Sequence, residues 1–212
     1  MPMGKRDTKQ VILEAALELF AVNGYDGVTV ADIADAVGIK AASLYKHYKS
    51  KQDIFDSILA KAAQGYSELA GQLGIDGQAY ENDAERFAGM GMDTLIQAGM
   101  ALFQYFLHDD TARKLRRMLT IEQYKNPSAS KLFAEQYITA PLDFPGALFN
   151  VFVGMGIMRE LDTDVAAAQF YAPIYLMLCL CDNCPEREAQ ALDLIQRHIA
   201  QFNSMYMREE EK

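Results

Sequence analysis

Positive charge gathers in one short stretch of this chain. Residues 40–51 contain four lysines and one histidine but no acidic residue, although the 212-residue chain has a formal net charge of -9. Ammonium and imidazole groups spaced along one segment are suited to binding phosphate oxygens. The alternative is a solvated surface that binds nothing. The cationic residues are Lys40, Lys46, His47, Lys49 and Lys51.

Two short helices with a tight turn between them must position these residues. Thr29, with Asp32 three residues later, has the spacing of a capping box, which predicts a helix start at residue 29. Gly38 ends this helix, and residues 40–47 form a second short helix. A helix-turn-helix needs small residues between its helices and a glycine at the turn, and Ala34 and Gly38 meet these needs. The apolar contacts beneath come from Ile33, Val37, Ile39 and Leu44.

Apolar residues recur at helical spacing through nearly the whole chain, and strand patterns are almost absent. The expected fold class is therefore all-α, with a three-helix head and a larger helical body. The head is expected at residues 1–50 and the body at residues 51–212. Pro141 and Pro145 are expected to break the helical pattern. The expected helices cover residues 6–22, 29–37, 40–47, 50–73, 83–107, 109–123, 128–139, 146–159, 163–181 and 186–206.

Composition limits where the protein acts. Half of the residues are hydrophobic, which allows a sizeable core. Residues 1–60 hold seven Lys or Arg and eight Asp or Glu, whereas residues 61–212 hold thirteen and twenty-one, so most of the excess acid lies outside the head. The apolar runs are interrupted before the ~20 residues that a membrane span needs, and residues 1–6 do not resemble a signal peptide. We expect a soluble, cytoplasmic protein with no membrane partner.

Three motifs in the head fall at fixed offsets from one another. They are Asn23-Gly24-Tyr25-Asp26-Gly27-Val28-Thr29, then Ile33-Ala34 followed by Val37-Gly38-Ile39, then Ser43-Leu44-Tyr45-Lys46-His47-Tyr48 before Lys49-Ser50-Lys51. Through them, residues 6–60 resemble the tetracycline-repressor (TetR) family of transcriptional regulators. Over the remaining residues the similarity is limited to length, helix content and the run from Asp162 to Pro173.

The resemblance implies a homodimer that binds double-stranded DNA at a palindromic operator. The second short helix of each head would enter a major groove, with Leu44 and Tyr48 in the core of the head. Because alanine cannot hydrogen-bond to a base edge, direct readout would depend on Lys40, Ser43 and Tyr45, with DNA shape supplying the rest. The residues expected to contact bases or phosphates are Thr29, Lys40, Ala41, Ala42, Ser43, Tyr45, Lys46, His47 and Lys51. His47 is otherwise an ordinary surface histidine.

The resemblance also implies a small-molecule effector site in the body. Methionine and aromatic residues are abundant there, methionine adapts to irregular ligands, and binding pockets are mostly apolar. An uncharged or weakly charged hydrophobic molecule is therefore the expected effector. The alternative for each of these side chains is a place in an ordinary core. The candidate pocket residues are Met100, Phe103, Gln104, Met118, Tyr137, Phe152 and Met155.

Two long apolar helices near the C-terminus predict the dimer contact. Residues 163–181 and 186–206 would form a four-helix interface across a two-fold axis. Small residues in the first of these helices, Ala166, Ala167, Ala168 and Ala172, would allow a second pair to approach closely. The residues expected in the interface are Tyr175, Leu176, Leu194, Ile195 and Ile199.

Patterns of catalytic residues are not found. No nucleophile-elbow, phosphate-loop or dinucleotide motif occurs, and the three histidines lie far apart in the sequence. Cys179, Cys181 and Cys184 form the one cysteine cluster, and buried reduced thiols are favoured there over a sensing site. We expect no enzyme activity, no cofactor and no metal. The leading hypothesis is a ligand-responsive, DNA-binding repressor. The rival class is a helical small-molecule-binding protein or enzyme whose head does not bind DNA, and the cationic run argues against it.

Overall fold

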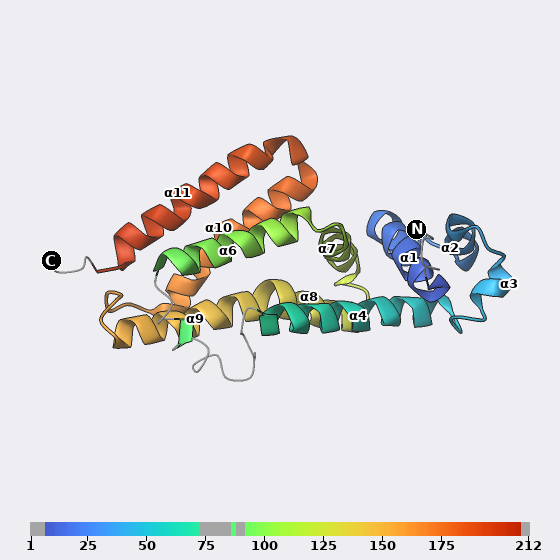
Figure 1. Ribbon diagram of the computed structural model, residues 1–212, viewed down its shortest axis with the longest axis horizontal. Helices are drawn as coiled ribbons and strands as arrows, with labels where there is room; N and C mark the ends of the chain where they lie inside the picture. Colours follow the sequence, from blue (N-terminus) through green and yellow to red (C-terminus); the bar gives the residue numbers. More distant parts are fainter. Residues whose placement is uncertain (1–6, 73–85, 88–91, 209–212) are drawn as a thin grey trace, which may run out of the picture. The chain divides into compact units, whose positions relative to one another are not determined.

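The computed structural model describes residues 7–72, 86–87 and 92–208 (Figure 1). These residues form helices and turns, with one isolated antiparallel bridge between Met158 and Met207, so the all-α expectation is confirmed. The chain divides into two compact units, which are described separately. The first contains Met1–Ser67 and Asp110–Phe133, and the second contains Glu68–Asp109 and Ala134–Lys212.

This division into compact units differs from the expected domain boundary at residue 50. Ile54 and Phe55 are fully buried in the head, and the ring of Phe55 lies 5.7 Å from that of Phe20. Residues 110–133 return to the same unit much later in the chain. The head is thus built from two separate stretches of sequence, which helical periodicity does not indicate.

The first unit is built around helix α1 (Thr8–Asn23). The Asp7 carboxylate accepts the N–H of Lys9 and so begins the helix, and Gly24 ends it. Apolar residues recur every four positions, so that Ile12, Ala16 and Phe20 share one buried face. The other helices of the unit are α2 (Val30–Val37), α3 (Ala41–Leu44), the first part of α4 (Lys51–Gln72), α7 (Asp110–Glu122) and most of α8 (Pro127–Ala134).

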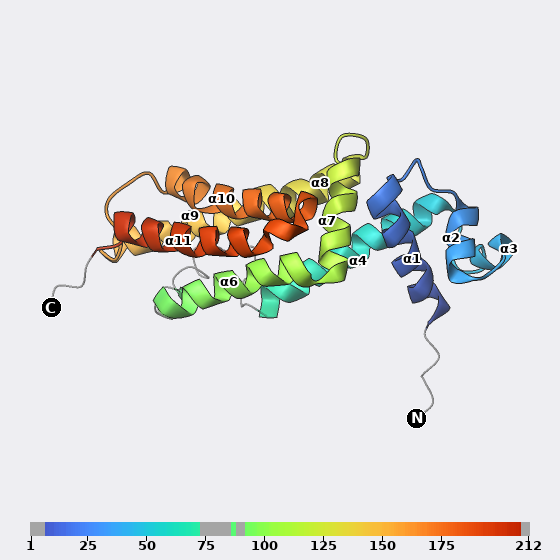
Figure 2. The same cartoon turned by 90° about the horizontal axis from the view of Figure 1, so that it is seen from above.

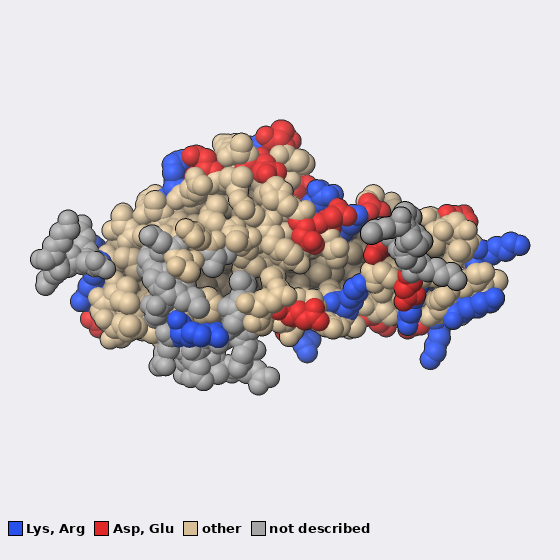
Figure 3. All heavy atoms as spheres, viewed as in Figure 1, with Lys and Arg blue, Asp and Glu red and all other residues tan. Residues whose placement is uncertain are grey.

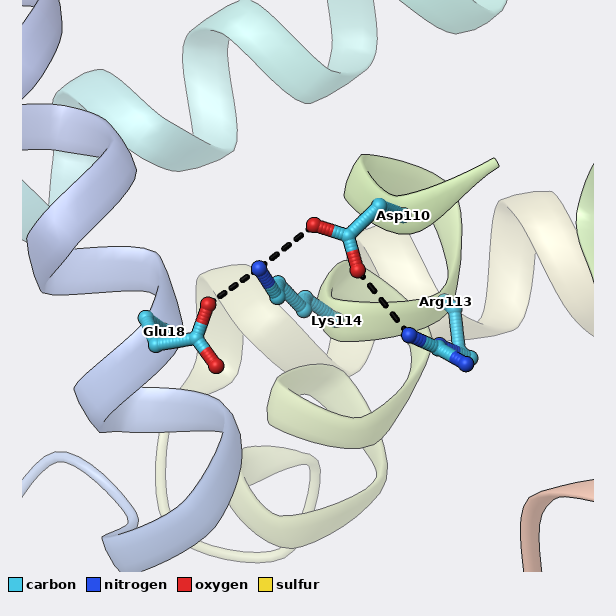
Figure 4. A network of polar contacts seen from close by, with 4 residues as sticks. All are labelled: Glu18, Asp110, Arg113 and Lys114. Atoms are coloured by element: carbon cyan, nitrogen blue, oxygen red, sulfur yellow. Dashed lines mark hydrogen bonds and ion pairs between the residues drawn. The ribbon is translucent and has the colours of Figure 1, made fainter. Parts of the chain in front are cut away.

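A charged network fastens α1 to α7 (Figure 4). The Lys114 ammonium contacts the Glu18 carboxylate on α1 and lies 2.5 Å from the Asp110 carboxylate, which Arg113 also contacts at 2.9 Å. The hydrogen bond from Lys114 is the main cause that lowers the pKa of Asp110, and the same bond raises the pKa of Lys114. Because both carboxylates are largely exposed, the network orients the two helices more than it stabilises them.

The second unit is organised around helix α10 (Thr163–Asn183). This helix packs against α6 (Met92–His108), α9 (Ala140–Gly154) and α11 (Glu188–Tyr206), as Figure 2 shows. A 3-10 turn at Pro185–Arg187 leads from α10 into α11. Buried apolar side chains form two clusters. One includes Phe149, Phe152 and Phe202, and the other includes Phe103, Met177 and Ile195.

A π-helical turn, η1 (Glu135–Thr139), joins α8 to α9. Helical backbone therefore continues from Pro127 to Gly154, and the expectation that Pro141 and Pro145 break the pattern was wrong. Pro141 lies just after the π-helical turn, and the Tyr137 carbonyl, to which an N–H at residue 141 would donate in an α-helix, accepts the Tyr171 hydroxyl instead. The bond that Pro145 cannot donate would end at residue 141 in the first turn of α9, so α9 loses one hydrogen bond and continues.

Helix α10 is also the one described helix that is long and apolar enough to cross a membrane, with a mean hydropathy of 1.4. The expectation that every apolar run is too short was therefore wrong for Thr163–Asn183. A single such helix is weak evidence for a membrane span, because the core helix of a soluble protein passes the same test. Only 28% of its apolar window is buried within the protomer, which leaves apolar surface to be covered.

Candidate nucleic-acid interface

Helix α2 is fixed at both ends by its own sequence. The Thr29 hydroxyl oxygen accepts the Asp32 N–H at 3.2 Å, and the Thr29 N–H donates to the Asp32 carboxylate at 2.7 Å, which completes the predicted capping box. The hydrogen bonds that the Asp32 carboxylate accepts, first from the Thr29 hydroxyl and then from the Thr29 N–H, lower the pKa of Asp32. At the other end Gly38 adopts the left-handed φ of 73°, and the Ile39 N–H donates to the Ala34 carbonyl at 3.0 Å.

The capping box uses the Thr29 side chain within the head. Its hydroxyl also donates to the Asp32 carboxylate at 2.7 Å, so the hydroxyl serves as donor and as acceptor within the head. Thr29 therefore begins α2, and its expected phosphate contact stays a prediction. The residue still lies at the surface, beside the turn that carries the helix.

Helix α3 is a short turn held on a buried base. Leu44 is fully buried and Tyr48 nearly so, which confirms their expected place in the core of the head. The Tyr48 hydroxyl donates to the Lys9 carbonyl on α1 at 3.2 Å. Burial is the main cause that raises the pKa of Tyr48 to about 12. The backbone of α3 is thereby anchored, so its outer side chains have a defined position.

The outer side chains of α3 and its flanks are those that DNA contact requires. Tyr45 is 53% exposed, and Ala41 and Ser43 are partly buried. Lysine and arginine side chains project from the end of the head that carries α3, as Figure 3 shows. Besides Tyr45, the exposed members of the expected DNA-binding set are Lys40, Ala42, Lys46 and His47, and Lys49 is exposed beside them.

The side chain of Lys51 makes contacts within the head. Its ammonium donates to the carbonyl oxygens of Tyr25 and Val28, each at 2.8 Å, and lies 4.1 Å from the centre of the Tyr25 ring. These contacts hold the start of α4 against the turn that leads into α2. Two of its three hydrogens are used inside the head, and the expected phosphate contact of Lys51 stays a prediction.

A second contact, which no pattern in the sequence indicates, holds the same turn. Glu122, at the end of α7, is 2% exposed, and its carboxylate accepts the Tyr25 N–H at 2.8 Å. Gly24 lies directly beside it, since a Cβ there would come within 3.1 Å of the Glu122 carboxylate. The two bonded residues are 97 positions apart, so no local pattern identifies them.

The expected effector residues are not gathered into one lining. Phe103 is buried with Met100 packed beside it, and Phe152 belongs to the other apolar cluster. Tyr137 is buried on η1, and its ring lies 5.9 Å from that of Phe106. Three further candidates lie apart from these side chains. Met118 is buried in the first unit, Met155 is 59% exposed at the end of α9, and Gln104 is exposed on α6.

Some of the residues expected in the dimer interface are buried within the protomer, and others are exposed. Ile195 and Ile199 are buried in the protomer's own core with Phe103, so their assignment to the interface is corrected. Leu176 is 61% exposed, Leu194 is also exposed, and Tyr175 is partly buried. Two faces of α11 are apolar, and the inner one contains the two isoleucines.

Metal-binding and thiol groups can be assessed over the same residues. Across 7–72, 86–87 and 92–208, no three His, Cys, Asp or Glu side chains gather in a way that could hold a metal ion. Cys179, Cys181 and Cys184 are free thiols, and Cys181 is buried.

A helix α2 capped at both ends, a glycine turn and a second short helix with exposed cationic residues form a helix-turn-helix in this head. Residues 12–58 match the family described as bacterial regulatory proteins, tetR family. The match confirms that the head resembles the TetR family.

Curated relatives match this head alone. Over 48 residues the chain is 50% identical to the biofilm operon icaADBC HTH-type negative transcriptional regulator IcaR of Staphylococcus aureus (strain Newman), which covers 23% of this chain and 26% of that protein. IcaR of Staphylococcus epidermidis is 49% identical over 47 residues, covering 22% and 25%. The chain thus matches about a quarter of the length of these relatives.

Solved structures match nearly the whole chain. A TetR-family regulator from Mesorhizobium loti has a TM-score of 0.63 at 19% identity, covering 95% of this chain and 97% of that one. SmeT, the repressor of the Stenotrophomonas maltophilia multidrug efflux pump SmeDEF, has a TM-score of 0.61 at 18% identity, covering 97% of this chain and 93% of that one. SmeT has also been solved in complex with triclosan. A regulator from Saccharomonospora viridis in complex with choline has a TM-score of 0.64 at 19% identity, covering 97% and 100%. At these identities the likeness establishes a shared fold.

Proposed function

We propose that this protein is a ligand-responsive, DNA-binding transcriptional regulator that acts as a repressor. The observation that carries the proposal is the exposed cationic end of a head in which α2 is capped at both ends and Gly38 makes the turn into α3. The match of residues 12–58 to the TetR family supports it, as does the identity with IcaR, a negative transcriptional regulator.

The proposed DNA contacts follow from exposure. Lys46 and His47 would bind phosphates, and Ser43 and Tyr45 would contact base edges, because the hydroxyl groups of serine and tyrosine are donors and acceptors. Lys40 precedes the first turn of α3 and would reach a phosphate or a base edge. Ala41 and Ala42 would contribute apolar contact with a thymine methyl group at most.

A homodimer is proposed because α10 leaves an apolar stripe uncovered. Val165 and Leu176 are large exposed side chains, and the exposed Ala168 and Ala172 lie between them at spacings of three and four residues, which places all four on one helix face. Contiguous exposed apolar surface marks interaction sites. A dimer built here would present two heads to half-sites ~34–36 Å apart on one palindromic operator.

The proposed control is by a hydrophobic small molecule that binds the second unit. A ligand that binds best in one arrangement of the dimer shifts the population toward that arrangement and weakens DNA binding if the heads no longer match the half-sites. The relatives solved with triclosan and with choline support a small-molecule effector. The aromatic and methionine side chains of the second unit favour an apolar one.

The test of DNA binding starts from a random pool of duplex DNA. Fragments enriched by the protein should share a palindrome, and their binding, followed by fluorescence anisotropy, should weaken steeply between 50 and 200 mM salt. Lys46→Ala should lower the slope of log affinity against log salt by about one. Lys131→Ala, an exposed lysine on α8, is the matched control and should change neither. Failure to enrich any sequence would count against a regulator and in favour of the rival class.

A further inference from the structure

A buried glutamine of the second unit carries a donor group that is not used within the described residues. Gln136 is 3% exposed, and its amide nitrogen Nε2 makes no hydrogen bond within the part of the chain that the structure describes. A buried donor left without an acceptor costs on the order of 1–3 kcal/mol, whereas an apolar residue of the same shape avoids that cost. Folding alone gives no reason for glutamine at this position, and such groups in proteins require an explanation.

The backbone around Gln136 is unusual in the same place. The residue lies on the π-helical turn η1 within an otherwise α-helical run from Pro127 to Gly154. Turns of this kind are rare and are frequent at functional sites. An α-helical path through η1 would rotate every following side chain of α9 about the helix axis, so the turn sets which residues face inward.

Aromatic residues of two other helices hold this turn. The Tyr171 hydroxyl on α10 donates to the Tyr137 carbonyl at 2.8 Å, and the Phe106 ring on α6 lies edge-on to the Tyr137 ring at 5.9 Å. Tyr137 itself is buried. The segment that carries Gln136 is therefore fixed by α6 and α10, which favours a preorganised binding group over a side chain that is free to find another partner.

We propose that the Gln136 amide binds the hydrogen-bond acceptor of an uncharged, largely apolar molecule, of the kind a ketone or ester carbonyl provides. The inference rests on the proposed binding of an effector and specifies its chemistry. An amide N–H donates to a carbonyl oxygen, and the aromatic neighbours of the turn suit a flat apolar body. Because a neutral amide cannot compensate a buried charge, a charged group is not expected at this position.

Two probes of the same shape test the inference. Benzophenone and diphenylmethane have the same two rings and differ in a carbonyl group against a methylene group. Calorimetry on the full chain should show benzophenone binding about tenfold more tightly, which corresponds to one hydrogen bond. Gln136→Met should reduce the affinity for benzophenone to that for diphenylmethane. Gln104→Met, an exposed glutamine on α6, is the matched control and should keep the preference.

The unliganded protein provides an independent readout. Removing a donor that has no partner should leave the melting temperature of Gln136→Met at or above that of the wild type. A marked fall would show that the amide already serves the fold and would overturn the inference, as would equal affinities in the wild type, no binding of either probe, or a preference that survives the substitution. Gln136→Leu repeats the test if the methionine variant does not fold.

Failure of the inference can be told apart from failure of the proposed function. If benzophenone binds through Gln136 while affinity for the selected DNA stays constant, the binding group is real and ligand control of DNA binding is wrong. If the selected DNA is bound and neither probe shows the expected preference, the regulator stands and the role of Gln136 is wrong.

Discussion

The ammonium nitrogen of Lys51 lies 2.8 Å from the carbonyl oxygen of Val28, which joins the first residue of α4 to the segment that begins α2. Thr29, the next residue along the chain, caps α2. A cation that belongs to the run at residues 40–51 is thus used to hold the helix-turn-helix in place. The remaining cations of this run, at Lys40, Lys46 and Lys49, are left at the surface.

Substitution of Lys51 should therefore act through stability. Lys51→Met keeps most of the side-chain length but leaves two carbonyl groups without their donor, and we expect a loss on the order of 1–3 kcal/mol in the free energy of unfolding. Thermal melts would measure this loss. DNA affinity should fall with it, whereas the salt slope should stay unchanged. A variant that melts like the wild type but whose slope of log affinity against log salt is lower by about one would instead support a phosphate contact by Lys51.

Local sequence predicted the helix-turn-helix well because local contacts define the ends of α2 and the turn that follows it. The capping box of Thr29 and Asp32 and the left-handed Gly38 each depend on residues within a few positions, so their spacing alone identified the two short helices. The bond between Glu122 and Tyr25 spans 97 positions, and no periodic pattern carries such information.

The body was less predictable for a different reason. Helix α11 is apolar on more than one side, and periodicity cannot tell which side faces the protomer's core. Ile195 was assigned to a dimer contact and lies in that core, while Leu194 beside it is exposed. The same ambiguity affected the pocket, where Met155 and Gln104 were expected inside and lie at the surface.

Glu122 should be important for the stability of the head. Its carboxylate is the acceptor for the Tyr25 N–H, so Glu122→Leu leaves this donor unpaired and should cost on the order of 1–3 kcal/mol. Glu122→Gln keeps an acceptor oxygen and should cost less. Glu18→Gln, at an exposed ion pair on α1, should change stability by at most ~1 kcal/mol. Chemical denaturation would rank the three, and equal stability of the leucine and glutamine variants would refute the hydrogen bond's contribution.

Tyr48 should make the head sensitive to alkaline pH. Burial raises the pKa of this phenol from its ordinary 10.0 to about 12. Above pH 10 the unfolded chain loses the phenol proton while the folded chain keeps it, so the unfolded state binds fewer protons and stability falls as pH rises. The contribution is fully present below pH 10 and is lost toward pH 12.

Tyr48→Phe tests this sensitivity. The variant should melt slightly lower than the wild type at pH 8, because it lacks the hydrogen bond to the Lys9 carbonyl. Between pH 9 and 11 its melting temperature should fall less than that of the wild type. Tyr45→Phe, at an exposed tyrosine on the same segment, should follow the wild type at every pH. Parallel curves for Tyr48→Phe and the wild type would rule out this phenol as the titrating group.

Charged substitutions at Leu176 and at Ile195 should distinguish an effect on dimer assembly from an effect on folding. Leu176 is 61% exposed in the protomer, whereas Ile195 is 1% exposed. Leu176→Glu adds a charge to the apolar stripe of α10 without disturbing the protomer, so it should give folded monomers with wild-type helix content. Ile195→Glu buries an unpaired charge and should unfold the second unit. Gln196→Glu, at the exposed neighbour on α11, is the control for added charge and should remain dimeric. Light scattering at micromolar concentration with circular dichroism distinguishes these outcomes. A wild type that is monomeric, or a Leu176→Glu variant that is still dimeric, would show that α10 does not form the interface.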